Sequence, residues 1–232
     1  MRYAILTIDD SPNENTLNFA SYLAEQHISA VFFCIGKNIE EHLNTSEQII
    51  KFGHDIGNHS YSHKNFSKIS FDECIEEINK TEDVINKIYR SVGIKRKKRY
   101  FRFPYGNKGE INKSKIQKYL KSCGFEKIDL GLDIEYLWYH ENGLNDDVDI
   151  FWTFDCEDYR ISSIDKPFGL NDVFEHINEK SPCLGGSLVS GIGPEIILIH
   201  DHLKTHAMFP EYYKSIISRI KEKGIRFRDS NQ

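Results

Sequence analysis

The sequence alternates short apolar runs, rich in β-branched and aromatic residues, with longer amphipathic segments. Runs of this length and composition are typical of buried β-strands, and the segments between them are typical of helices. The run 196–199 is apolar at every position, which suits a parallel sheet covered by helices. We therefore expect an α/β fold of parallel strands joined by helical crossovers, and we favour a closed or nearly closed barrel over an open sheet. The strands are expected at residues 3–8, 30–35, 55–57, 100–103, 150–154 and 195–199.

Local patterns predict where two of the helices begin. Ser11 followed by Pro12 predicts a helix in which Ser11 is the N-cap and Pro12 takes the first helical position. Ser70 and Glu73 form a capping-box pattern, which predicts a second helix that ends near Tyr89.

Two stretches lack the alternating pattern. Residues 129–149 are acidic and contain Trp138, and residues 181–194 are rich in Gly and Ser. We expect both stretches to form loops or lids. Because 232 residues can build one sizeable core, we predict a single domain spanning 1–232 with an insert at about 129–149.

Charge and cysteine content narrow the possible partners. The formal net charge of -5 and the pI near 6.1 argue against binding to nucleic acid, which needs an excess of Lys and Arg on one face. The five cysteines are scattered without a C-x-x-C pair, so neither a zinc knuckle nor a disulfide framework is indicated. The first apolar run is too short for a signal peptide, and no run approaches the length of a transmembrane helix. We therefore expect a cytoplasmic protein with no membrane span, or a secreted one if a leader has been removed.

Reactive side chains follow three of the expected strands. Asp9 and Asp10 follow the first strand, His59 and His63 follow the third, and His200 follows the last. In α/β folds, reactive residues gather at the carboxyl ends of parallel strands. Successive residues leaving a strand point to opposite sides, so Asp9 and Asp10 can serve different roles, one binding a cation and one facing a water. The alternative for this pair is a helix-capping Asp beside a surface Asp.

The histidines suggest a metal site and an acid. His59 and His63 are four residues apart, which on a helical turn brings both rings within reach of one ion. Together with the Asp10 carboxylate they would leave coordination positions open, as a catalytic Zn²⁺ site requires. In a chain with ten histidines, this spacing also arises by chance. His200 offers an imidazole that can donate a proton near pH 7, although alone it would be interpreted as structural.

Five segments in order carry a resemblance to a known family. They are Thr-Ile-Asp-Asp (7–10), His-Ser-Tyr-Ser-His (59–63), Arg-Phe-Pro-Tyr-Gly (102–106), Trp-Thr-Phe-Asp-Cys-Glu-Asp-Tyr (152–159) and Leu-Ile-His-Asp (198–201). They resemble the motifs of the polysaccharide deacetylases of carbohydrate esterase family 4, the NodB-homology group. The resemblance implies a distorted (β/α) barrel with one divalent metal, Zn²⁺ or alternatively Co²⁺, Fe²⁺ or Mn²⁺. It also implies removal of the acetyl group from an N-acetylated sugar or polysaccharide.

The resemblance implies a role for each site residue. The metal ligands would be Asp10, His59 and His63. Asp9 would be the general base that takes a proton from a water activated by the metal, and His200 would be the general acid. The supporting residues would be Arg102, paired with Asp9; Asp158, which orients His200 and favours its protonated form; Tyr105, whose backbone N–H stabilises the oxyanion; and Leu198, which receives the acetyl methyl group.

The chain departs from the family pattern at several positions. Ile8 stands where Phe is usual, Ser11 where Gly is usual, and Tyr159 where a groove-lining Trp is expected. These changes affect packing and the shape of the groove without removing a reactive group. The insert 129–149 suggests a particular acceptor, and its Trp138 either stacks on a sugar or serves as a core or interface aromatic.

Two other functions are compatible with the same residues. An amide hydrolase of this fold acting on a small non-sugar amide or cyclic imide would need a closed pocket instead of a sugar-wide groove. A non-catalytic carbohydrate-binding relative would lack a ligand, base or acid, and all of these side chains are present. Because the chain shows no leader, we expect a soluble or lipid-linked N-acetylated sugar as the substrate.

Overall fold

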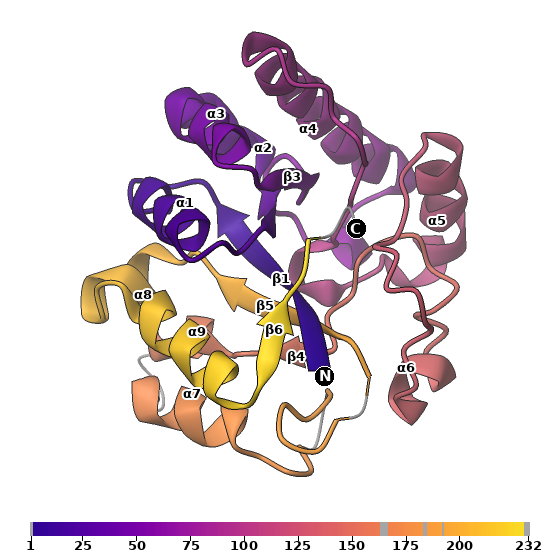
Figure 1. Ribbon diagram of the computed structural model, residues 1–232. Coiled ribbons are helices and arrows are strands. Elements are labelled where there is room, and N and C mark those ends of the chain that lie inside the picture. Colours follow the sequence, from indigo (N-terminus) through magenta and orange to yellow (C-terminus); the bar gives the residue numbers. More distant parts are fainter. Residues whose placement is uncertain (1, 163–166, 183–184, 192, 230–232) are drawn as a thin grey trace.

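The computed structural model describes residues 2–162, 167–182, 185–191 and 193–229. Its strands form one sheet, and the helices are arranged around that sheet (Figure 1). The strands are β1 (Arg2–Ser11), β2 (Ala30–Cys34), β3 (Asp55–Asn58), β4 (Phe154–Asp155), β5 (Glu195–His200) and β6 (Ile225–Phe227). The helices are α1 (Thr16–Glu25), α2 (Gly36–Glu41), α3 (Leu43–Lys51), α4 (Phe71–Ser91), α5 (Lys113–Ser122), α6 (Leu137–Glu141), α7 (Leu170–Ile177), α8 (Leu203–Met208) and α9 (Tyr212–Glu222).

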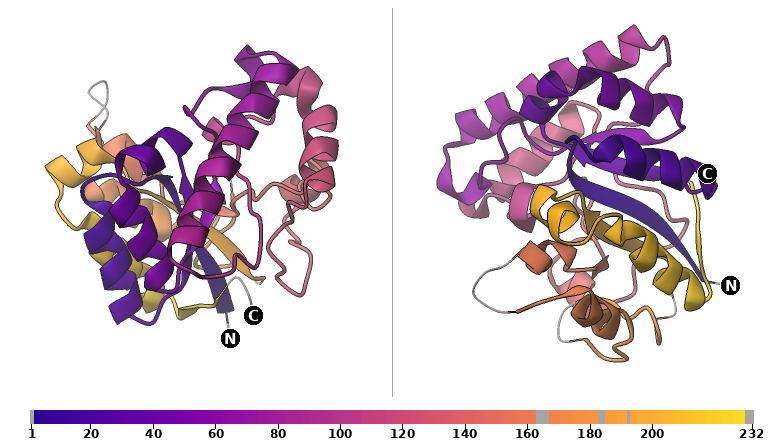
Figure 2. Two further views of the ribbon diagram at one scale, coloured as in Figure 1. Left: turned by 90° about the horizontal axis from the view of Figure 1, so that it is seen from above. Right: turned by 90° about the vertical axis from the view of Figure 1, so that its left-hand side faces the viewer.

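The strand order places β1 at the centre of the sheet. The order is β3-β2-β1-β5-β4, and β6 pairs with the first residues of β1. Every pairing between these strands is parallel, which confirms the expected α/β architecture. The helices that connect successive strands pack around the sheet. Among them, α4 and α5 lie side by side on its outside (Figure 2). Four of the expected strands correspond to β1, β2, β3 and β5, whereas the three-residue β6 has no counterpart among them.

The expected strands 100–103 and 150–154 form only fragments of β structure. Phe154 and Asp155 make up β4, and Phe101 forms a single bridge with Asn58. The pairing does not continue beyond Arg102, because Pro104, two residues further on, has no N–H to donate. Four backbone hydrogen bonds still close the sheet into a distorted barrel between β3 and β5. They run from Asn58 N to Tyr100 O (2.8 Å), Arg102 N to Asn58 O (3.0 Å), Ile150 N to Phe101 O (2.8 Å) and Thr153 N to Ile196 O (2.9 Å).

The two predicted helix starts have different outcomes. Ser70 caps α4 as predicted, since its hydroxyl accepts from the Glu73 N–H while the Glu73 carboxylate accepts from the Ser70 N–H at 2.9 Å. Ser11 does not cap a helix, because it belongs to β1, where it pairs with Cys34. The peptide bond that follows it is cis. The first helix begins only at Thr16.

Alternate residues of β1 face two different cores. Leu6 packs outward against the helices, in a cluster that includes Phe19 of α1. Ile5 faces the inside of the barrel, in a second cluster that includes Phe33 of β2. Because side chains alternate along a strand, the inward row that contains Ile5 ends at Asp9. The interior of the barrel therefore leads from an apolar core to a carboxylate.

The insert 129–149 packs as part of the inner core. Apart from α6 it is irregular, as expected, and it contributes Leu130, Ile134 and Tyr139 to the cluster around Ile5. Trp138 packs against this cluster, which agrees with its interpretation as a core aromatic. All residues of this insert are described, and none lines the main cavity, so the segment is not a lid over that cavity.

The structure also bears on three smaller expectations, which concern the stretch 181–194, the cysteines and a membrane span. In the stretch 181–194, positions 183, 184 and 192 lie outside the described residues, Cys183 among them, and the described positions there form no helix or strand. Cys34, Cys74, Cys123 and Cys156 are free thiols. Within the described ranges, no helix combines the length and the apolar character that crossing a membrane would need.

Replacing Ile197 by Ala tests the packing of β5. Ile197 is fully buried between Leu6 of β1 and Phe154 of β4. We expect Ile197→Ala to lower the free energy of unfolding by about 2–5 kcal/mol, because the substitution removes buried apolar surface and leaves a cavity. Urea unfolding followed by circular dichroism measures the change, with Ile111→Ala, at a side chain 93% exposed, as the matched control. Equal losses in the two variants would contradict this assignment of the core.

Candidate active site

The strand ends that carry the predicted site residues meet at one cavity. The cavity has a volume of about 900 Å³ and opens at the carboxyl ends of β1, β3 and β5. Its walls include eight of the ten predicted residues, namely Asp9, Asp10, His59, His63, Tyr105, Tyr159, Leu198 and His200. The other two, Arg102 and Asp158, are buried and contact members of this wall. The structure therefore brings all the predicted site residues together.

A bulge in β1 turns Asp9 and Asp10 toward the same cavity. Asp9 lies opposite Phe33 of β2, but Ser11 lies opposite the very next residue, Cys34, so that one extra residue stands between these pairs. Asp10 is that residue, and its backbone is left-handed, with a φ of 69°. The expectation that the two carboxylates leave the strand on opposite sides does not hold, because the bulge redirects Asp10.

His59 and His63 lie in a tight loop, so the predicted helical turn is wrong. Ser60 and His63 both have left-handed backbones, with φ of 62° and 56°. The Ser60 hydroxyl accepts from the His63 N–H at 3.0 Å, and Glu77 of α4 accepts from the N–H and the hydroxyl of Ser62, each at 2.7 Å. The loop still brings the two imidazoles together, with their ring centroids 5.0 Å apart.

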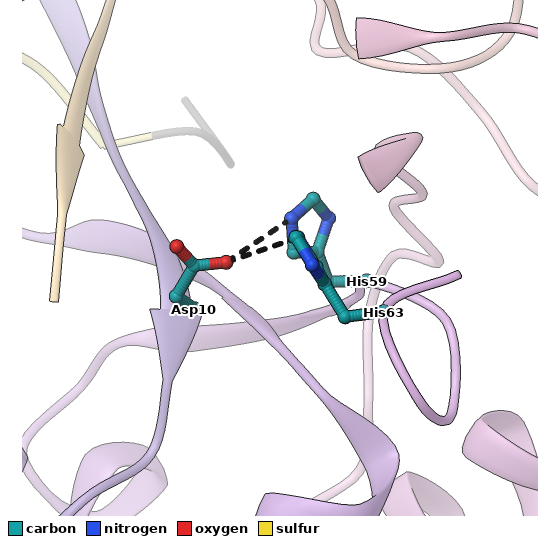
Figure 3. Close-up of side chains that lie close together, drawn as sticks. All are labelled: Asp10, His59 and His63. Atoms are coloured by element: carbon teal, nitrogen blue, oxygen red, sulfur yellow. Dashed lines mark ion pairs between the residues drawn. The ribbon is translucent and has the colours of Figure 1, made fainter. Parts of the chain in front are cut away.

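Asp10, His59 and His63 direct their ligand atoms toward one small volume (Figure 3). Oδ1 of Asp10 lies 3.2 Å from Nε2 of His63 and 3.7 Å from Nε2 of His59. Nδ1 of His59 lies 2.9 Å from the backbone oxygen of Arg102, and a hydrogen bond there leaves the lone pair of Nε2 facing Asp10. The buried Oδ1 of Asp10 has no hydrogen-bond partner among the described residues. Three acceptor atoms within 4.8 Å of one another fit a divalent cation, which satisfies all three at once.

The surroundings of Asp10 and His59 favour the forms of these two side chains that bind metal. Burial opposes the charge of Asp10, but the neighbouring imidazoles, first that of His63, outweigh it and hold the pKa of Asp10 well below its usual range. Burial lowers the pKa of His59, against the opposing influence of Asp9. An ionised carboxylate beside a neutral imidazole is the state that a metal requires.

A buried arginine holds Asp9. Nη1 of Arg102 donates to Oδ1 of Asp9 at 2.8 Å and to the Thr7 hydroxyl at 2.9 Å. Arg102 is 1% exposed, and its guanidinium carbon lies 4.3 Å from the centre of the Phe33 ring. Oδ2 of Asp9 lies 3.7 Å from Nε2 of His59. Asp9 therefore pairs with Arg102 through Oδ1, as predicted, and turns Oδ2 toward the candidate metal ligand His59.

His200, at the end of β5, lies beside two carboxylates. Its ring nitrogen Nδ1 is 3.3 Å from Oδ1 of Asp158 and 3.9 Å from Oδ1 of Asp155. The backbone N–H of His200 also donates to Oδ2 of the fully buried Asp158, at 3.1 Å. Burial lowers the pKa of His200, but the charges of Asp155 and Asp158 outweigh it and raise that pKa to about 10. Burial raises the pKa of Asp155 to about 6, against the influence of His200. His200 therefore carries a proton at neutral pH.

Three further predicted residues form parts of the cavity wall. Tyr105 has a left-handed backbone, with a φ of 59°, and its 67% exposed side chain lies with its ring centroid 4.6 Å from that of His63. Tyr159 packs edge-on against His200, with 4.8 Å between ring centroids. Leu198, on β5, is fully buried and lines the cavity.

Three residues of this site were not predicted from the sequence, and two of them are Asp155 and Trp152. Asp155 is the second carboxylate beside His200, and Trp152 lines the cavity with its ring stacked on Phe151 at 4.2 Å between centroids. Both belong to the segment 152–159, in which only the last two residues were assigned roles. The strand-end rule that singled out His200 applies equally to Asp155, because Asp155 is the last residue of β4.

Asp201 is a third missed residue, and it ties the strand ends together. Its buried carboxylate accepts from the Ser11 hydroxyl at 2.9 Å, from the Thr16 hydroxyl, and from Nε2 of His206 at 2.7 Å. The backbone N–H of Asp201 donates to the backbone oxygen of Asp9 at 2.9 Å. One side chain thus connects β5 to the end of β1, to the start of α1 and to α8.

Comparison with known proteins identifies the family. The polysaccharide deacetylase family matches residues 1–128, which is more than half of the chain. The chain therefore belongs to the polysaccharide deacetylase family, as the five motifs had suggested. Family membership supports a deacetylase activity.

Two curated relatives align with part of this chain. A peptidoglycan-N-acetylglucosamine deacetylase of Bacillus cereus is 40% identical over 84 residues, which is 36% of this chain and 30% of that protein. The peptidoglycan-N-acetylmuramic acid deacetylase PdaC of Bacillus subtilis is 37% identical over 84 residues, which is 36% of this chain and 18% of that protein. These alignments thus span less than a third of either relative.

Solved structures share the whole fold. A crystal structure of a peptidoglycan N-acetylglucosamine deacetylase has a TM-score of 0.63 and 23% identity, covering 98% of this chain and 85% of that one. A CE4 family pseudoenzyme from Bacillus anthracis has a TM-score of 0.66 and 21% identity, covering 97% and 62%. At these identities the likeness establishes the fold alone. Because an enzyme and a pseudoenzyme share it, activity has to be argued from the side chains of the site.

Metal affinity tests the assignment of the ligand group. We expect the protein to bind Zn²⁺ or Co²⁺ at one site, and His63→Ala to weaken that affinity by more than about 100-fold, since loss of even an outer-shell partner costs about 10–100-fold. Isothermal titration calorimetry of metal-stripped protein measures the affinity. His140→Ala, at an exposed histidine of α6, is the control and should bind like the wild type. Equal affinity of the wild type and His63→Ala would refute the assignment.

Proposed function

We propose that this protein is a metal-dependent hydrolase that removes the acetyl group from an N-acetylated sugar or polysaccharide. The proposal rests on one observation. A set of candidate metal ligands, a carboxylate paired with an arginine and a protonated histidine all lie at one cavity. Asp10, His59 and His63 would hold the metal. Two nitrogens and a carboxylate suit Zn²⁺, and Co²⁺, Fe²⁺ and Mn²⁺ accept the same ligands.

The first half of the reaction needs a base. A bound divalent ion would polarise the amide carbonyl and lower the pKa of water, so that a carboxylate suffices as the base. Asp9 is positioned for this role, because Arg102 fixes one of its oxygens and leaves Oδ2 facing the ligand group. The backbone N–H of Tyr105, on the wall of the same cavity, would stabilise the negative charge that develops on the carbonyl oxygen.

The second half of the reaction needs an acid, because an amine is a poor leaving group until it is protonated. His200 carries the proton, and the Asp158 carboxylate 3.3 Å from its Nδ1 stabilises the charged ring. The proton would pass from His200 to the departing nitrogen as the carbon–nitrogen bond breaks. Leu198 offers an apolar surface for the acetyl methyl group.

The shape of the cavity favours a sugar over a small planar amide. At about 900 Å³ it is close to the upper end of ordinary ligand sites, which range over about 300–1,000 Å³. Aromatic side chains on its wall, those of Tyr105, Trp152 and Tyr159, offer flat faces suited to sugar rings. The names of the relatives, which are deacetylases of peptidoglycan sugars, support the same substrate class. A non-catalytic role is disfavoured because ligands, base and acid are all present.

Acetate release from chitotetraose, the tetramer of N-acetylglucosamine, tests the proposal. We expect the Zn²⁺- or Co²⁺-loaded protein to release acetate, and His200→Asn to lower kcat by at least about 100-fold, the lower bound for loss of an acid catalyst. His140→Asn is the matched control and should keep the wild-type rate. Absence of acetate from neutral and charged N-acetylated sugars alike, despite bound metal, would contradict the proposal.

The pH profile tests the partnership of Asp158 and His200 separately. A raised pKa keeps His200 protonated at neutral pH, so the alkaline loss of activity should occur as the pH rises through that pKa. Asp158→Asn removes one of the carboxylates that raise it, and the alkaline limb of kcat should move to lower pH. Asp133→Asn, in the exposed part of the insert, should leave the limb in place. An unmoved limb in Asp158→Asn would contradict the partnership.

A further inference from the structure

Lys204 lies on the wall of the active-site cavity and is not used by the proposed chemistry. It belongs to α8, four residues after His200, and its side chain is exposed. Of the described residues that line the cavity, Lys204 is the only lysine or arginine. Its charge reaches the neighbouring His202, whose pKa is lowered first by burial and also by Lys204. The lysine is therefore electrostatically part of the cavity.

The carboxylates on the cavity wall already have basic partners. These pairs are Asp9 with Arg102 at 2.8 Å, Asp10 with His63 at 3.2 Å, Asp155 with His200 at 3.9 Å, and Asp201 with His206 at 2.7 Å. The side-chain ammonium of Lys204, in contrast, makes no ion pair or hydrogen bond with any described residue. Lys204 is thus the only lysine or arginine on this wall, and none of the described carboxylates forms an ion pair with it.

We propose that Lys204 binds an anionic group carried by the substrate, a carboxylate or a phosphate on or next to the N-acetylated sugar. This inference rests on the proposed function and narrows its substrate class to acidic sugars. A lysine ammonium is a point charge that pairs with either anion without a fixed geometry. Because the side chain is exposed, pairing costs little desolvation, and its strength should fall as salt screens it.

Tetrasaccharides of matched length test the inference. The three substrates are chitotetraose, the same tetramer with a lactyl carboxylate on alternate sugars, and the same tetramer carrying a 6-phosphate. KM and kcat for acetate release are measured with the metal-loaded wild type, Lys204→Gln, Lys204→Arg and Lys118→Gln. Lys118 is an exposed lysine of α5, away from the cavity, and serves as the matched control.

The expected result is a preference expressed in KM. At low salt the wild type should have a KM about fivefold lower for at least one anionic tetramer than for chitotetraose, the size expected of an exposed charge pair. The ratio of the two KM values should fall to about one in Lys204→Gln and survive in Lys204→Arg and Lys118→Gln. Added NaCl should reduce the preference of the wild type toward that of Lys204→Gln. Comparing the two anionic tetramers tells which anion is bound.

Failure of the inference differs visibly from failure of the proposed function. If the wild type deacetylates all three tetramers with equal KM, or if Lys204→Gln raises KM equally for all of them, Lys204 binds no substrate anion while the deacetylase activity stands. If the metal-loaded wild type releases no acetate from any of the three, the proposed function itself fails.

Discussion

The parallel register of β1 with its two neighbours is the constraint on which the site depends. In that register Asp9 lies opposite Phe33 of β2 on one side and opposite His200 of β5 on the other. The proposed base and the proposed acid are thereby placed opposite each other on adjacent strands. A slip of one residue would turn Asp9 from the interior toward the helices, because side chains alternate along a strand. The buried rows of β1 and β5 fix this register by packing on both faces of the sheet.

The bulge at Asp10 adds the second element of the site. A regular strand would leave Asp9 and Asp10 on opposite faces, so a left-handed residue is needed to bring both carboxylates to one cavity. Asp201 braces this irregular stretch, since it accepts from the Ser11 hydroxyl and donates its N–H to Asp9. The cost of holding several ionised groups at the end of a barrel is offset because each carboxylate has a basic partner. A divalent ion would complete the pattern by satisfying the buried oxygen of Asp10.

Much of this arrangement could be predicted from the sequence, because strand ends and reactive residues coincide. The uninterrupted apolar runs predicted the central strands, and the polar residues just beyond them predicted which edge of the sheet carries the chemistry. The side of the barrel between β3 and β5 was not predictable. Residues 100–103 have the composition of a strand, yet they form only a single bridge before Pro104. The loop from His59 to His63 likewise has a spacing that suits a helix, and its hydrogen bonds to α4 decide its shape. Asp155 could have been found by the same strand-end rule, whereas the contacts of Asp201 with β1, α1 and α8 depend on tertiary packing, which residue patterns do not encode.

In the proposed site, three strand ends converge on one divalent cation with an open coordination position. The most direct test of this convergence is a crystal structure of the protein grown with Zn²⁺, with anomalous diffraction recorded at the zinc edge. We expect one strong peak about 2.0–2.2 Å from a carboxylate oxygen of Asp10 and from a ring nitrogen of both His59 and His63, with at least one position filled by solvent or acetate. A peak elsewhere in the molecule, or a fourth protein ligand that closes the coordination sphere, would contradict it.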